Sequence, residues 1–61
     1  MNDDLNTYLV GAYIVGLSGK KVTLTEMVKA KTKEDAGLLV AEMIKFEGWK
    51  FGGIDYIDWA D

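Results

Sequence analysis

Three aspartates near the C-terminus, Asp55, Asp58 and Asp61, have the types and spacing with the most potential for chemistry in this 61-residue chain. Carboxylates this close together can bind a divalent cation, can present an acidic surface to a basic protein groove, or can simply be solvated. Asp3 and Asp4 join this acidic end if the two termini lie close together. We expect an acidic surface here and no metal site.

Catalytic chemistry has little to build on, because the chain contains no histidine and no cysteine. The commonest general base and the commonest metal ligands are therefore missing, and Ser18 has no histidine to activate it. The segment Gly16–Lys21 resembles a phosphate-binding loop, but such a loop leads into a helix, and here the β-forming residues 22–24 follow. We expect a protein that is not an enzyme and that binds no cofactor.

Composition and charge narrow the class of protein and its partners. A chain that is 49% hydrophobic is too apolar for disorder, so we expect one domain over residues 1–61, with residues 1–4 as a flexible tail. Its net charge of −3 disfavours direct binding to nucleic acid. The acidic N-terminus and the short apolar runs predict neither a signal peptide nor a membrane span, and we expect a cytoplasmic location.

The elements that position these residues begin with an uncharged segment, Leu5–Gly19. A first strand is predicted from Thr7 to Val15, and it is apolar on both faces. One face carries Tyr8, Val10, Ala12 and Ile14, and the other carries Leu9, Gly11, Tyr13 and Val15. A strand of this kind needs cover on both faces, and so short a chain has material for only one, which leaves a surface for a partner.

Two further strands are predicted at Lys21–Lys31 and Trp49–Trp59. The earlier one alternates apolar and polar residues, as a half-exposed strand does, and Glu26 breaks the pattern as either a bulge or an edge position. In the later one, the pair Gly52-Gly53 predicts a bulge.

A helix is predicted from Lys33 to Glu47, with Thr32 as its N-cap. Gly48 suits the position after the helix, where Trp49 can fold back on Ile44. The apolar stripe expected to face the sheet consists of Ala36, Leu39, Val40, Met43 and Ile44.

The predicted order of elements is β-β-α-β, which makes this an α+β protein. A right-handed crossover through the helix makes the last strand parallel to the second. The uncharged first strand then lies between them in a three-stranded antiparallel or mixed sheet of order 2-1-3, with the helix packed on one face.

One helix of this length cannot shield all seven aromatic residues, so part of the set should be exposed at a protein interface. We expect the remainder to pack in the core. The predicted interface residues are Tyr8, Tyr13, Tyr56, Ile57 and Trp59.

The pattern from Thr25 to Trp59 is a strand, a threonine-capped helix opening with Glu-Asp-Ala, then Gly-Trp and a closing strand rich in isoleucine. It resembles small β-β-α-β proteins encoded by bacteriophages, among them inhibitors of RNA polymerase and of other host enzymes. The resemblance implies host takeover by steric occupation of a host protein's surface, in the cytoplasm of the host cell. It assigns no functional residue.

These observations predict a small acidic protein-binding module of the phage-inhibitor type, which occupies a basic surface of a host nucleic-acid-handling enzyme. The alternative is a homo-oligomeric structural or accessory protein whose sheet faces pair with one another. The expected partners are a host protein, a second copy of the chain in a homodimer, or both.

Overall fold

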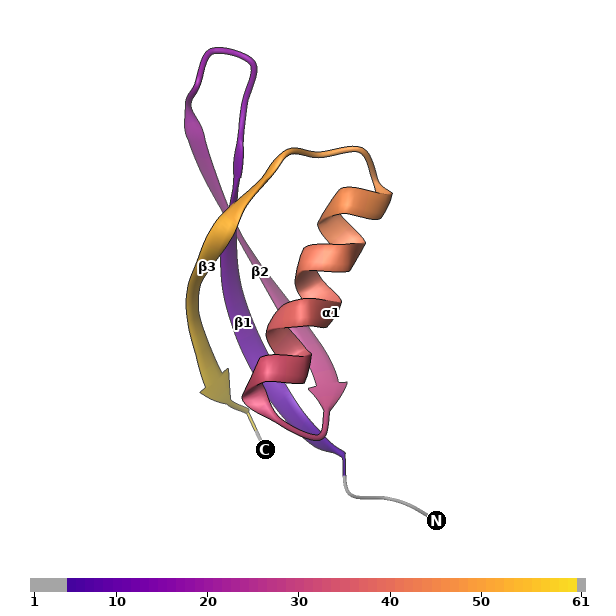
Figure 1. Cartoon of the computed structure of the whole chain (residues 1–61). Helices are drawn as coiled ribbons and strands as arrows, with labels where there is room; N and C mark the ends of the chain where they lie inside the picture. Colours follow the sequence, from indigo (N-terminus) through magenta and orange to yellow (C-terminus); the bar gives the residue numbers. More distant parts are fainter. Residues whose placement is uncertain (1–4, 61) are drawn as a thin grey trace.

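The computed structural model describes residues 5–60. Four elements follow one another along the chain (Figure 1): β1 (Asn6–Val15), β2 (Lys21–Ala30), α1 (Lys33–Phe46) and β3 (Phe51–Trp59). The predicted β-β-α-β order and the α+β class are confirmed, and each predicted boundary lies within two residues of the observed one.

The sheet has the predicted strand order, β2-β1-β3, and both outer strands pair antiparallel with β1. The two outer strands therefore run in the same direction, and α1 crosses one face of the sheet to connect them (Figure 1). This arrangement puts the uncharged strand in the centre and leaves β2 and β3 as the two edges.

The two strand pairs differ in regularity. The β1–β2 register runs without a break, and Glu26 lies opposite Val10, so this half-buried glutamate marks an edge position and not a bulge. The β1–β3 register shifts twice and leaves Gly52 and Asp55 as extra residues in β3. The bulge predicted from the glycine pair is therefore confirmed, and the second bulge, at Asp55, is one that the sequence analysis missed.

Both ends of α1 are closed as the sequence predicts. The Thr32 hydroxyl oxygen accepts a hydrogen bond from the Asp35 backbone N–H at 3.1 Å. At the other end Gly48 has a φ of +91°, which glycine adopts at the lowest cost. The backbone N–H groups of Gly48 and Trp49 then donate to the carbonyls of Lys45 and Ile44, and these two bonds define a Schellman motif.

The core between helix and sheet is small, and three of its residues are alanines. Its buried members are Tyr8, Val10, Ala12, Ile14, Ala30, Ala36, Val40 and Ile44. The helix approaches β3 closely at Gly37, where an added Cβ would lie 3.3 Å from the Ile57 Cδ1 atom.

The predicted helix stripe needs a correction, because Leu39 and Met43 are each 41% exposed. Three strands spaced about 4.8 Å apart form a sheet roughly as wide as one helix with its side chains. Residues on either side of the contact line therefore overhang the sheet edges. Only Ala36, Gly37, Val40 and Ile44 are buried along this helix.

Candidate protein-binding surfaces

The sheet face turned away from the helix has no covering element within residues 5–60. Directly paired residues share a face, so the register assigns to it Leu9 with Met27, and Gly11 with Tyr56. Tyr13 also lies on this face. We call the surface formed by Leu9, Tyr13, Met27 and Tyr56 the open face.

The two tyrosine rings of the open face rest on glycine backbone. A Cβ added at Gly11 would overlap the Tyr56 ring, and one added at Gly52 would overlap the Tyr13 ring. A Cβ at Gly53 would lie 2.8 Å from the Tyr13 hydroxyl oxygen. Each ring therefore occupies the space that a side chain on the neighbouring strand would fill, and this contact restricts its movement.

A lysine links Tyr13 to one of the predicted acidic residues. The Lys21 Nζ atom lies 4.3 Å from the centroid of the Tyr13 ring and 3.6 Å from the Asp55 Oδ1 atom. Both charged side chains are partly exposed, so the pair is worth little in stability. Lys21 supplies Asp55 with a positive counter-charge beside the aromatic ring.

The predicted acidic end is divided by the structure. Asp55 has Lys21 as its counter-ion, Asp58 lies opposite Leu9 on the open face, and Asp61 lies outside the described residues. Within residues 5–60, no three histidine, cysteine or acidic side chains come close enough together to hold a metal ion.

The net negative charge of the chain comes from its two ends. Asp3, Asp4 and Asp61 lie outside the described residues, and the part between them contains equal numbers of acidic residues and lysines. The Ala60 backbone N–H donates to the Thr7 carbonyl oxygen at 2.8 Å. The described chain therefore begins and ends at the same end of the sheet.

The predicted interface residues fall on two different faces. Tyr13 and Tyr56 lie on the open face, whereas Tyr8 and Ile57 point to the helix side. Tyr8 is only 8% exposed, so it belongs to the core and is not available to contact a partner. Because side chains alternate along a strand, Tyr8 and Tyr13, five residues apart, cannot share a face. Trp59, 67% exposed, lies opposite Tyr8 at the sheet edge.

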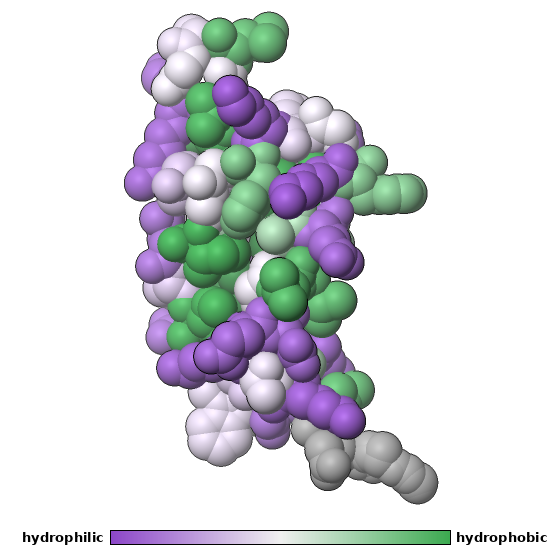
Figure 2. Space-filling model, in the orientation of Figure 1, coloured by the Kyte–Doolittle hydropathy of each residue, from purple (hydrophilic) through white to green (hydrophobic). Residues whose placement is uncertain are grey.

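A second apolar region, which the sequence analysis missed, follows both flanks of the helix. Figure 2 shows apolar surface gathered between α1 and β3, where Leu38, Ile54 and Ile57 line a hollow of about 440 Å³. On the β2 side, Leu39, Met43 and the 91% exposed Phe46 are uncovered. The unbroken apolar run over residues 36–41 was the available signal, since it makes an arc wider than a three-stranded sheet can bury.

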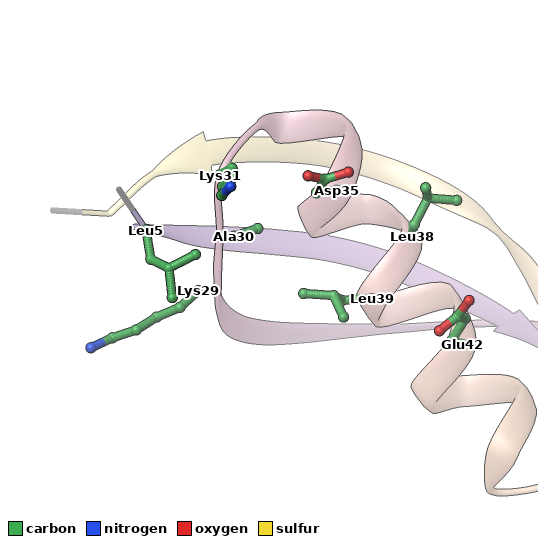
Figure 3. A pocket seen from close by; sticks show the side chains of 8 residues that line it. All are labelled: Leu5, Lys29, Ala30, Lys31, Asp35, Leu38, Leu39 and Glu42. Carbon is green, nitrogen blue, oxygen red and sulfur yellow. The ribbon is translucent and has the colours of Figure 1, made fainter. Parts of the chain in front are cut away.

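Near the beginning of the helix, the β2 side is hollowed but carries charge of both signs. Figure 3 shows Leu5 and Leu39 around this hollow, with Lys29, Asp35 and Glu42 among the charged side chains that line it. Because lysines and acidic residues both line this hollow, its charge favours neither an anionic nor a cationic ligand.

No known family matches this chain, and comparisons with curated proteins and with solved structures find no match either. Within residues 5–60, the one helix is too short and too polar to cross a membrane.

Proposed function

We propose that this chain is a non-enzymatic protein-binding module that contacts its partner through the open face. One observation carries the proposal: the rings of Tyr13 and Tyr56 lie against glycine backbone on a sheet face that no other element covers. Tyr56 is 43% exposed, so its ring is accessible to a partner.

Tyrosine suits this role for two physical reasons. Its ring gives a large contact area that is apolar on its face and polar at its hydroxyl, and it has only two side-chain torsions to immobilise. Rings already held against glycine lose less conformational freedom on binding, which favours affinity. The neighbouring exposed threonines of β2, Thr23 and Thr25, add adaptable hydrogen-bonding groups at the edge of the same face.

The partner in this proposal has a basic surface. The excess negative charge of the chain resides in Asp3, Asp4 and Asp61, and an excess of negative charge attracts a positively charged partner surface during encounter. The resemblance to phage-encoded inhibitors adds a candidate partner, a nucleic-acid-handling enzyme of the host, which this chain would inhibit by occupying its surface.

Site-specific photo-crosslinking tests the proposal. A benzophenone amino acid replaces Tyr56 on the open face or, as the control, the fully exposed Leu17 in the β1–β2 turn. In an extract of the cells in which the protein acts, position 56 should give a defined crosslinked product. Excess unlabelled wild-type protein should suppress that product, and excess Tyr13→Ala protein should suppress it poorly. Identical products from both positions, or none from position 56, would contradict the proposal.

A further inference from the structure

We propose that copies of this chain also assemble side by side, with the β2 side of one copy against the β3 side of the next. This inference concerns the edges of the sheet and the flanks of the helix, and it does not depend on the tyrosines of the open face. The β2 flank is defined by Leu39, Met43 and Phe46 with the nearby glutamates, and the β3 flank by Leu38, Ile54 and Ile57 with Lys45.

The β2 flank combines apolar side chains with unpaired negative charge. Leu39, Met43 and Phe46 line a hollow of about 330 Å³ together with Glu42 and Glu47. A second hollow adjoins it and adds Glu26 from the edge strand. No lysine lines either hollow. The ion pair found in residues 5–60 joins Lys21 to Asp55 beside Tyr13, on the sheet face away from the helix. The three glutamates therefore lack a counter-ion within the described chain.

The β3 flank has the complementary character. Its hollow is almost entirely apolar, and the charged residue that lines it is Glu34, in the first turn of the helix. Near the other end of the helix, the Lys45 Nζ atom lies 5.8 Å from the centroid of the Phe51 ring, on the β3 side. Lys45 has no carboxylate partner within residues 5–60.

The topology allows the two flanks of neighbouring copies to meet at matching positions along the strand direction. Since β2 and β3 run in the same direction, a second copy placed beside the first in the same orientation keeps both helices on one side of a continued sheet. Lys45 of one copy then lies level with Glu42 and Glu47 of the other. On the sheet face away from the helix, Lys29 lies opposite Thr7, and Asp58 lies opposite Leu9, two residues further along β1. Lys29 of one copy and Asp58 of the next therefore also come close.

Two-fold pairing is opposed by charge where its axis passes near the acidic residues. A contact between two β2 flanks centred near Glu42 would set the glutamates of one copy against those of the other, and a contact between two β3 strands centred at Asp58 would place the two aspartates opposite each other. The bulges at Gly52 and Asp55 leave only residues 56–59 of β3 regular enough for strand pairing, so most of the contact consists of side chains on the flanks. A head-to-tail contact of this kind continues from copy to copy, either closing into a ring or extending as a filament.

The test uses two variants at exposed positions, Phe46→Glu on the β2 flank and Lys45→Glu on the β3 flank. The mass in solution is measured by light scattering after size-exclusion chromatography over a hundredfold dilution, and far-ultraviolet circular dichroism checks the fold. Wild-type protein should form assemblies larger than a dimer at the highest concentration. Each variant alone should dissociate at concentrations at least tenfold higher than wild type.

Mixing the two variants distinguishes a head-to-tail contact from a two-fold one. Each variant retains one intact flank, so the mixture should form a one-to-one heterodimer while each variant alone is monomeric. A wild-type protein that is monomeric at every concentration would overturn the inference. So would a folded variant that keeps the wild-type mass, because a two-fold contact through one flank is unaffected by a change on the other.

Discussion

At the residue scale, the open face depends on glycines as much as on aromatic residues. Gly11 lies in the central strand, where glycine is otherwise unfavourable, and the ring of Tyr56 occupies the space above it. Gly52 and Gly53 in β3 likewise leave the space that the Tyr13 side chain occupies. The tyrosines and glycines therefore act as two units that each span two strands.

Replacement of Gly11 by alanine should displace the Tyr56 ring and lower the free energy of unfolding by roughly 1–3 kcal/mol, the usual cost of overpacking. The matched control is Gly16→Ala, whose added methyl group would make only an ordinary contact, 3.5 Å from the Lys20 carbonyl oxygen. Urea denaturation of both variants makes the comparison. Equal stability of the two variants would show that the Tyr56 ring does not rest on Gly11 in solution.

At the element scale, local signals account for most of what the sequence predicted. The Thr32 cap, Gly48 and the alternation of β2 depend on neighbours in the chain, and the structure confirms all three. The exposure of Leu39 and Met43 depends instead on the width of the sheet beneath the helix. That width is a property of the assembled fold, so a helical periodicity alone could not reveal it.

The helix ending makes a second prediction. Gly48 has a positive φ, so Gly48→Ala should lower the free energy of unfolding by roughly 1–2 kcal/mol, because a Cβ disfavours the left-handed backbone conformation. Gly48→Asn should cost less, since asparagine visits this region more readily. Thermal or urea unfolding measures both variants. A Gly48→Ala protein as stable as wild type would mean that the Schellman ending does not hold in solution.

The candidate site was predictable only in part. Tyr13 and Tyr56 were identified from composition and strand alternation, but their glycine supports follow from a β1–β3 register that contains two bulges. The bulge at Asp55 contains no glycine, so the sequence gives no signal from which it could be predicted. Tyr8 was assigned to the interface by residue type, whereas its burial follows from which face of β1 the helix covers.

At the scale of the whole molecule, charge is divided between a neutral body and acidic ends. Residues 5–60 carry no net charge, and Asp55 is already paired with Lys21. Any long-range attraction to a basic partner therefore arises mainly from Asp3, Asp4 and Asp61. This differs from the prediction made from sequence, in which Asp55 and Asp58 shared that role.

Changing Asp3, Asp4 and Asp61 together to asparagine should slow association with the partner by roughly tenfold at low ionic strength and reduce its dependence on salt. The control is Asp55→Asn, which removes one negative charge where the triple variant removes three, and which should change the rate much less. Stopped-flow measurements at several salt concentrations follow both variants. An unchanged rate for the triple variant would refute electrostatic steering by the termini.

The central claim is that the open face, and not the helix side of the sheet, binds the partner. The most direct measurement is the affinity of the crosslinked partner for two variants, Tyr56→Ala on the open face and Trp59→Ala on the helix side. Loss of an interface anchor worth about 2 kcal/mol weakens binding roughly 30-fold. We predict a loss of that order for Tyr56→Ala and less than about threefold for Trp59→Ala. The reverse order of affinities would contradict the account.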